Sequence, residues 1–188
     1  MVCEWQIVPA TVDMLPEILK LEEACFSAPW TRKMLEAELT GNQFAHFLVA
    51  MTRENTDPSR GNIIGYHCFW VVFDELRLMN LAVREASRNQ GVGRSLAREA
   101  IGFGARQGAT RAVLEVRASN EPAHMLYREM GFLPIGVRRQ YYSNPVEDAI
   151  LMEMAPLVLP AESPQGHATG AGGEAISGHV SNPGGTAC

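Results

Sequence analysis

The residues Arg88–Gly93, with the sequence Arg-Asn-Gln-Gly-Val-Gly, have the types and spacing of a loop that binds phosphate through its main chain. They follow a strand-like apolar run at 78–83 and precede a helical pattern at 94–107. The two glycines remove Cβ atoms where an anion approaches the backbone, and the first N–H groups of a helix have no partners within it. This arrangement favours a pyrophosphate at the start of the helix.

Spacing separates three kinds of phosphate loop. A dinucleotide fingerprint requires a third glycine three positions after Gly93, where the chain has Leu96, and a P-loop requires Gly-Lys-Ser/Thr, which the chain lacks. The remaining pattern, Arg/Gln-x-x-Gly-x-Gly/Ala, resembles the coenzyme A pyrophosphate loop of the GCN5-related N-acetyltransferases. For the hexapeptide alone, a simple tight turn before a helix is the alternative interpretation.

A second group of polar residues lies on the next strand and helix. The segment Leu114–Asn120 ends a predicted strand at 112–116, and Tyr127 follows on a helix for which Asn120 is a good cap. If this strand and the one at 77–83 are parallel neighbours, both helix N-termini point into one crevice. A glutamate such as Glu115 can remove a proton from an amine, and a tyrosine hydroxyl can donate one.

The motifs Leu-Glu-Val-Arg-x-Ser-Asn and Leu-Tyr-x-x-x-Gly-Phe resemble those of the bacterial ribosomal-protein-alanine N-acetyltransferases, a branch of the same superfamily. The resemblance extends over nearly all of residues 1–155. Further matching segments are Asn80–Val83, Pro29-Trp30, Arg138–Tyr142 and Glu147–Ala149.

This resemblance implies specific site residues. Glu115 takes the place of the general base and Tyr127 that of the general acid, with acetyl-coenzyme A as cosubstrate and no metal. The implied cofactor-binding residues are Leu81, Ala82 and Val83 for the acetyl-pantetheine arm, then Arg88, Asn89, Gln90, Gly91, Val92, Gly93, Arg94 and Asn120. The residues implied to shape the acceptor's entry are Pro29, Trp30, Tyr141 and Tyr142.

Each of these residues also has a simpler interpretation. Glu115 is compatible with a surface carboxylate paired with Arg117 or Arg94, and Tyr127 with a core aromatic residue whose hydroxyl lies at the rim. Asn120 is compatible with a helix cap alone.

Composition excludes several classes of protein. A formal charge of −5 with no basic cluster argues against a nucleic-acid-binding protein. No apolar run is long enough for a membrane span and no secretory signal is visible, so we expect a cytoplasmic protein. The four cysteines are scattered without a Cys-x-x-Cys pair, and the histidines lack the spacing of a metal site.

Strand and helix patterns alternate through residues 1–155 and predict a single α/β (α+β) domain. The resemblance adds a mixed, splayed β-sheet flanked by helices, the acyl-CoA N-acyltransferase fold. Residues 156–188, rich in Gly, Ala, Ser and Pro, predict a disordered tail. A polar segment at 138–148 is expected between the last two strands. Residues 52–62 are expected to form a long hairpin loop. The predicted strands are 5–8, 44–51, 63–73, 77–83, 112–116, 132–137 and 149–154. The predicted helices are 11–25 with Thr11 or Asp13 as its cap, 31–39 with Thr31 as its cap, 91–107 and 120–131.

The leading functional hypothesis is an acetyl-CoA-dependent enzyme that acetylates the N-terminal alanine of a small-subunit ribosomal protein by direct attack in a ternary complex. The alternatives are the same fold acting on other N-termini or small amines, and a noncatalytic coenzyme A-binding module. The sequence predicts neither nucleic-acid nor membrane partners and leaves the oligomeric state open.

Overall fold

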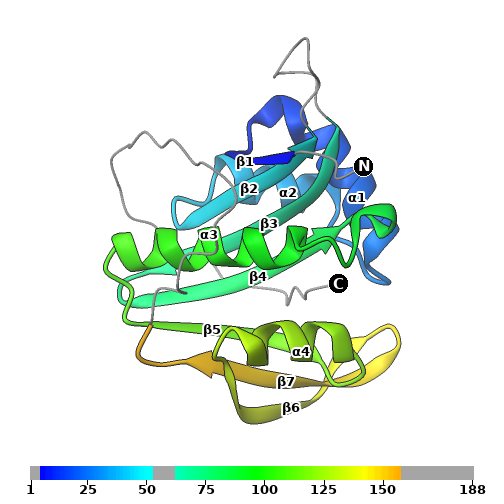
Figure 1. Cartoon of the computed structure of the whole chain (residues 1–188). Helices are drawn as coiled ribbons and strands as arrows, with labels where there is room; N and C mark the ends of the chain where they lie inside the picture. Colours follow the sequence, from blue (N-terminus) through cyan, green and yellow to red (C-terminus); the bar gives the residue numbers. More distant parts are fainter. Residues whose placement is uncertain (1–4, 53–61, 158–188) are drawn as a thin grey trace.

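One seven-stranded sheet carries all the helices in the computed structural model, which describes residues 5–52 and 62–157 (Figure 1). The strand order is β1-β2-β3-β4-β5-β7-β6. The strands are β1 (Trp5–Pro9), β2 (Ala45–Thr52), β3 (Ile63–Val72), β4 (Glu75–Val83), β5 (Arg111–Arg117), β6 (Leu133–Ser143) and β7 (Val146–Met154). The α-helices are α1 (Leu15–Cys25), α2 (Arg32–Thr40), α3 (Val92–Arg106) and α4 (Glu121–Glu129), and η1 (Val12–Met14) and η2 (Glu85–Ser87) are short 3-10 turns. The mixed sheet with flanking helices confirms the predicted fold.

The centre of the sheet contains its one parallel pair within the described residues, β4 beside β5. Pairing runs only from Glu75 opposite Arg111 to Leu78 opposite Leu114, although both strands continue beyond these residues. Just past Leu78, a register shift inserts an extra residue into β4 relative to β3. The two strands therefore separate toward their carboxyl ends, which confirms the predicted splay.

Helices cover both faces of the sheet (Figure 1). Helices α3 and α4 lie on one face, and α1 and α2 lie on the other face against β2, β3 and β4. Gly104 allows α3 to approach β4, because a Cβ at this position would lie only 3.0 Å from the Leu76 side chain. The core is accordingly divided into one cluster under α3 and one under α1 and α2.

Side-chain caps fix the starts of two helices. The Thr31 hydroxyl accepts a hydrogen bond from the Met34 N–H at the start of α2, and Asn120 accepts from the Ala123 N–H at the start of α4. Both caps were predicted from sequence. The cap predicted for the first helix is wrong, because η1 precedes α1 and neither element has a side-chain cap.

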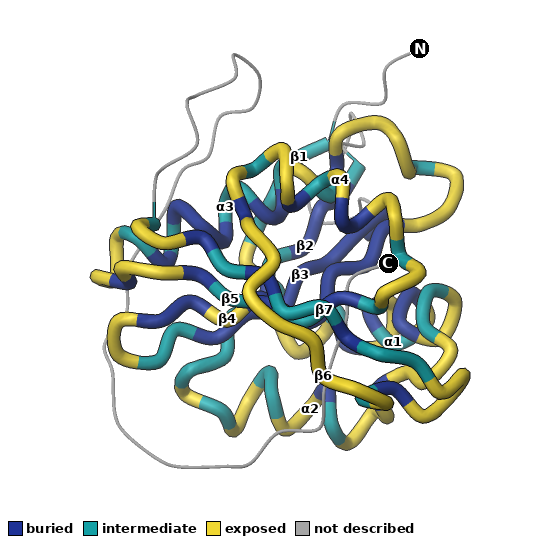
Figure 2. Tube along the Cα trace, turned by 90° about the horizontal axis from the view of Figure 1, so that it is seen from below, coloured by how far each residue is buried: buried dark blue, intermediate teal, exposed yellow. Residues whose placement is uncertain are grey.

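The segment 138–148 is not a loop between short strands. Strand β6 continues to Ser143 and β7 begins at Val146, so the two form a long antiparallel hairpin. An irregularity between Arg138 and Tyr142 interrupts the pairing, with Gln140 at a φ of +51° and its N–H donating to Asp148 Oδ1 at 2.8 Å. Strand β6 forms an exposed edge of the sheet (Figure 2), so its residues need no apolar alternation.

Two predictions lie outside the described residues. They are the disordered tail, of which 158–188 is not described, and the middle of the β2–β3 loop at 53–61. The base of that loop is described, with the Thr52 N–H donating to the Asn62 carbonyl at 3.0 Å. Within the described residues, no helix has the length and apolar character to cross a membrane.

Candidate active site

The separation of β4 and β5 opens a pocket of about 940 Å³ between α3 and α4. Its lining includes the residues at the N-termini of both helices, as expected for two parallel neighbouring strands. The predicted cofactor-binding residues that line it are Leu81, Val83, Arg88, Asn89, Gly91, Val92, Gly93, Arg94 and Asn120.

The glycine loop leaves the start of α3 accessible. Gly91 is the N-cap residue with a φ of +84°, in the left-handed region that favours glycine, and no side chain caps the helix. A Cβ added at Gly93 would meet Val83 Cγ2 at 3.5 Å and Leu81 Cδ2 at 3.7 Å, and both of these neighbours line the pocket. No side chain therefore competes for the first-turn N–H groups of α3, and the glycine loop together with this first turn fits a pyrophosphate.

Two predicted cofactor-binding residues lie outside the lining of this pocket. Ala82 belongs to the core cluster under α1 and α2, so its side chain is directed away from the pocket. Gln90 is exposed, and its side-chain amide donates to the Ala86 carbonyl at 3.0 Å. Only backbone groups of Ala82 remain available for the predicted role.

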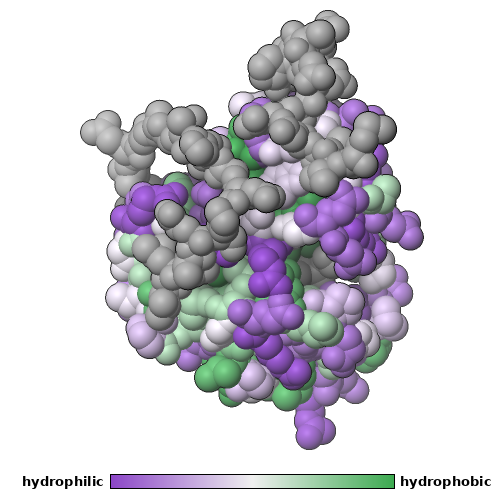
Figure 3. All heavy atoms as spheres, viewed as in Figure 1, coloured by the Kyte–Doolittle hydropathy of each residue, from purple (hydrophilic) through white to green (hydrophobic). Residues whose placement is uncertain are grey.

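Charged side chains span the pocket. Arg94 on α3 forms an ion pair with Glu129 on α4, and both residues line the pocket. On this face of the molecule, hydrophilic residues extend from one helix to the other beside apolar surface (Figure 3). The Arg88 guanidinium donates to the Val83 carbonyl at 3.1 Å and so fixes the loop to the end of β4.

Glu115 lies where β4 and β5 part, one residue beyond the last parallel pair. It lines a second, smaller pocket of about 130 Å³. Its Oε1 forms an ion pair with Arg138 Nη1 at 3.0 Å, rather than with Arg117 or Arg94 as the simpler interpretation suggested. The half-exposed Arg138 thus holds the Glu115 carboxylate at the point where β4 and β5 separate.

Tyr127 is 2% exposed and packs edge-on against Phe132, with the ring centroids 5.4 Å apart. It lies one helical turn after Ala123, which lines the large pocket. Burial raises the pKa of the Tyr127 hydroxyl well above its usual range, so the hydroxyl is protonated at neutral pH.

The predicted acceptor residues lie on two separate segments. Pro29 is exposed in the α1–α2 loop, whereas the Trp30 side chain is only 5% exposed and belongs to the core. The Tyr141 ring lies 5.4 Å from the guanidinium of Arg138, the arginine that pairs with Glu115, and burial raises the pKa of the Tyr141 hydroxyl. The Tyr142 ring lies beneath the Arg117 guanidinium, 4.1 Å from its centroid.

The family follows from comparison with known proteins. The model of the Acetyltransferase (GNAT) family matches residues 15–132, which include the glycine loop, Glu115 and Tyr127. The chain belongs to the GNAT family. Members of this family use acetyl-CoA, the cosubstrate that carries the pyrophosphate expected at the α3 N-terminus.

Relatives within the GNAT family point to one branch. A Bacillus subtilis (strain 168) protein, provisionally named a ribosomal protein bS18-alanine N-acetyltransferase, is 35% identical over 73% of this chain and 87% of its own length. The Escherichia coli (strain K12) ribosomal protein bS18-alanine N-acetyltransferase is 33% identical over 74% of this chain and 90% of its own. The crystal structure of the E. coli ribosomal-protein-S18-alanine N-acetyltransferase superposes with a TM-score of 0.71 at 27% identity, covering 85% of this chain and 99% of that one.

A buried carboxylate in this GNAT domain was missed from sequence. Glu22 on α1 is fully buried and accepts hydrogen bonds from the Trp30 N–H at 2.7 Å, from Asn80 Nδ2 at 3.0 Å and from the Tyr66 hydroxyl. It thereby joins the α1–α2 loop to β4 next to Leu81. A glutamate on an amphipathic helix gives no sequence signal for such burial.

Glu22 gives a prediction for pH dependence. Burial raises the pKa of this carboxyl above 4.5, because desolvation outweighs the three hydrogen bonds. The folded state then binds the proton more tightly than the unfolded state, so the stabilisation is complete below pH 4.5 and is lost as pH rises through the folded pKa. Relative to the wild type, Glu22→Gln should therefore gain free energy of unfolding as pH rises from about 4.5 to 7, as measured by urea denaturation.

The matched control is Glu23→Gln, which changes the exposed neighbouring glutamate. Its free energy of unfolding should follow that of the wild type across this pH range. A constant difference between Glu22→Gln and the wild type at every pH would contradict the raised pKa.

Among the described residues, no group of three His, Cys, Asp or Glu side chains is arranged to hold a metal ion.

Proposed function

We propose that this GNAT protein acetylates the N-terminal alanine of a small-subunit ribosomal protein in the cytoplasm. The observation that carries the proposal is the position of Glu115, which lies where β4 and β5 part. The pocket that opens beyond this point is lined by the N-terminus of α3, which no side chain caps. The relatives at 33% and 35% identity, which are named as bS18-alanine N-acetyltransferases, support this acceptor.

Acetyl-CoA would occupy the large pocket. The backbone amides from Asn89 to Arg94 would hold its pyrophosphate, and backbone groups of Leu81, Ala82 and Val83 would hold the acetyl-pantetheine arm. Asn120 lines the opposite side and would contact the cofactor while capping α4. When bound, the cosubstrate supplies an acetyl group activated as a thioester.

Glu115 would remove the proton from the acceptor amine. A protein α-amine has a pKa of about 7.7 to 8.0, so a carboxylate acting directly or through a water is a sufficient base near neutral pH. A backbone N–H near Leu81, beside the β4 irregularity, would donate to the carbonyl oxygen under attack. Tyr127 would donate a proton or a hydrogen bond to the departing sulfur.

Direct attack by the amine in a ternary complex is favoured over a covalent acyl-enzyme. Because Glu115 lies where β4 and β5 part and the α3 N-terminus lines the pocket that opens beyond this point, amine and thioester would meet without an enzyme-bound acetyl group.

Tyr127→Phe should lower kcat by about 10- to 100-fold and leave the KM for acetyl-CoA nearly unchanged. The leaving thiol has a pKa near 8.5, so proton donation accelerates its departure without being indispensable. Steady-state kinetics with an alanine-starting peptide measures both constants. An unchanged kcat would remove Tyr127 from the role of general acid.

The function is tested by mass spectrometry of acetyl transfer to a panel of acceptors. The panel contains ribosomal peptides that begin with alanine, the same peptides with other first residues, Nα-blocked peptides with a free lysine, polyamines and aminoglycosides. Preferred acetylation of the alanine-starting peptide is expected. Preference for lysine side chains or small amines would overturn the acceptor assignment, and cofactor binding without transfer would indicate a noncatalytic module.

A further inference from the structure

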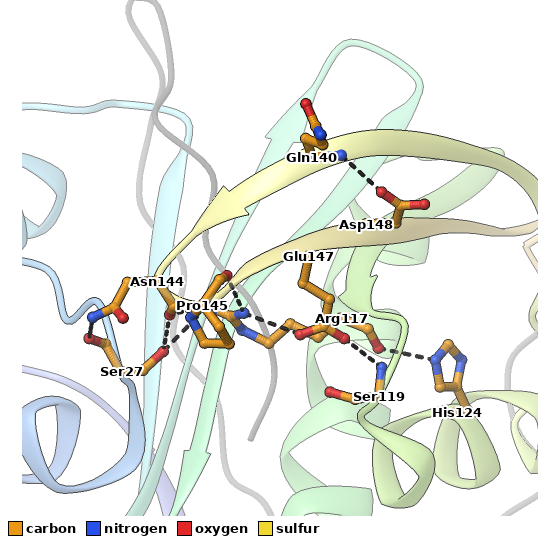
Figure 4. A network of polar contacts seen from close by, with 9 residues as sticks. All are labelled: Ser27, Arg117, Ser119, His124, Gln140, Asn144, Pro145, Glu147 and Asp148. Atoms are coloured by element: carbon orange, nitrogen blue, oxygen red, sulfur yellow. Dashed lines mark hydrogen bonds and ion pairs between the residues drawn. The ribbon is translucent and has the colours of Figure 1, made fainter.

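A network of polar contacts joins the end of β5 to the α1–α2 loop and to the β6–β7 turn (Figure 4). At its centre is Arg117, the last residue of β5, whose side chain is 18% exposed. Its guanidinium donates to Ser27 Oγ at 3.2 Å, to the Asn144 carbonyl at 3.0 Å, to the Pro145 carbonyl at 3.4 Å and to Glu147 Oε2 at 3.2 Å. One side chain therefore reaches both the α1–α2 loop and the β6–β7 turn.

The loop and the turn also bond directly to each other. The Ser27 hydroxyl donates to the Asn144 carbonyl at 2.6 Å, and Asn144 Nδ2 donates to the Ser27 carbonyl at 3.1 Å. These residues are 117 positions apart in the sequence. Arg117, Ser27 and Asn144 together form what we call the clasp.

The arginine at the centre of the clasp is itself fixed from several sides. Its guanidinium lies over the Tyr142 ring, and its carbonyl accepts a hydrogen bond from His124 Nε2 at 3.0 Å. Its partner Glu147 also accepts from the Ser119 N–H at 2.6 Å. Hydrogen bonds from Ser119 and then from Arg117 hold the pKa of Glu147 below its usual range, so this ion pair persists at neutral pH.

The clasp joins the two segments that carry the predicted acceptor residues. Pro29 and Trp30 follow Ser27 in the α1–α2 loop, and Tyr141 and Tyr142 precede the β6–β7 turn. We propose that Arg117 is a positioning residue that holds this loop and this turn together and thereby fixes the entrance through which an acceptor amine reaches Glu115. The inference rests on the proposed function, because it concerns the acceptor side of the same site.

Because the clasp already holds both segments in place before the acceptor binds, acceptor binding loses less conformational entropy. Loosening the clasp should therefore raise the KM for the acceptor peptide much more than it lowers kcat. Arg117 also lines the large pocket, so its substitution alone does not separate acceptor effects from cofactor effects. Ser27 lines neither of the two pockets and supplies that separation.

The kinetic test compares Ser27→Ala, Arg117→Met and the double variant. Each single variant should raise the acceptor KM by about 10-fold with kcat within about twofold, and Ser27→Ala should leave the KM for acetyl-CoA unchanged. Because the two residues act through one contact, the double variant should be clearly less impaired than the product of the single effects. Independent, multiplicative effects would overturn the proposal.

Two further variants test the geometry. Arg117→Lys keeps the charge but lacks the planar fork that reaches four acceptors, so it should not restore the acceptor KM. Wild-type kinetics in Arg117→Lys would show that charge alone matters and would overturn the clasp. The matched control, Arg128→Met, removes an exposed arginine of α4 that lines neither pocket and should behave as the wild type.

Hydrogen exchange tests the clasp without any activity. In Arg117→Met and in Ser27→Ala, amides of 26–31 and 140–148 should exchange at least about tenfold faster than in the wild type, in both segments at once. Unchanged exchange, or a change confined to one segment, would overturn the clasp. Failure of the wild-type protein to acetylate any amine would instead overturn the proposed function and leave this readout intact.

Discussion

Replacement of Glu115 by glutamine is expected to lower kcat for acetyl transfer by about 10²- to 10⁴-fold at neutral pH. Glutamine retains an oxygen for the contact with Arg138 but cannot take a proton from the acceptor amine. Fold and cofactor affinity should therefore persist while the proton-transfer step fails. Initial rates with an alanine-starting peptide, together with the KM for acetyl-CoA, measure the two effects separately.

The pH dependence makes this test sharper. As pH rises past the α-amine pKa of about 8, more of the acceptor is already unprotonated, so the deficit of Glu115→Gln should shrink. The matched control is Glu36→Gln, which changes an exposed glutamate on α2 and should have wild-type kinetics. Turnover of Glu115→Gln at the wild-type rate near pH 7 would remove Glu115 from the role of base.

The second large effect is expected at Gly93. Gly93→Asp places a carboxylate in the first turn of α3, where the helix dipole favours it, so the free energy of unfolding should be unchanged or slightly raised. The same carboxylate would lie beside Leu81 and Val83 at the pocket wall and repel a pyrophosphate. We expect the KM for acetyl-CoA to rise on the order of 100-fold or more, because like charges a few ångströms apart cost several kcal/mol.

Two control variants separate volume from charge at this position. Gly93→Ala adds a Cβ at ordinary contact distances of 3.5 and 3.7 Å, so it should fold normally and change the KM only slightly. Gly93→Asn has nearly the size of aspartate without its charge and should lie between the two. An unaltered acetyl-CoA KM in Gly93→Asp would show that the pyrophosphate does not bind at this helix terminus.

Local signals in the sequence predicted the secondary-structure elements around the large pocket well. The glycine loop, the Thr31 and Asn120 caps and the Arg77–Val83 strand depend on neighbours only a few positions away, and such interactions leave clear patterns. The parallel pairing of β4 with β5 followed from the strand–helix–strand order around α3. The structure confirms these elements, and residues of the glycine loop, of the end of β4 and of the start of α4 line one pocket.

The contacts around the proposed acceptor entrance and around Glu22 were harder to predict, because they join distant positions. Ser27 and Arg117 are 90 residues apart, and the partners of Glu22 lie on β3, β4 and the α1–α2 loop. Neither set has a characteristic spacing. Strand β6 was shortened in the prediction because it is an exposed edge strand with a pairing irregularity near Gln140, which removes the period-two pattern on which strand prediction relies.

At its two ends, β5 is joined to the half of the molecule that contains β4 by different kinds of interaction. From Glu75 to Leu78, the backbones of the two strands pair, and such pairing requires no particular side chain. At the other end, the hydrogen bonds of the clasp all involve the side chain of Ser27, Asn144 or Arg117. Under the proposed role of the clasp, single substitutions at these three positions can therefore alter which acceptors enter while the paired segments of β4 and β5 stay the same, so that related proteins with one backbone can differ in acceptor choice.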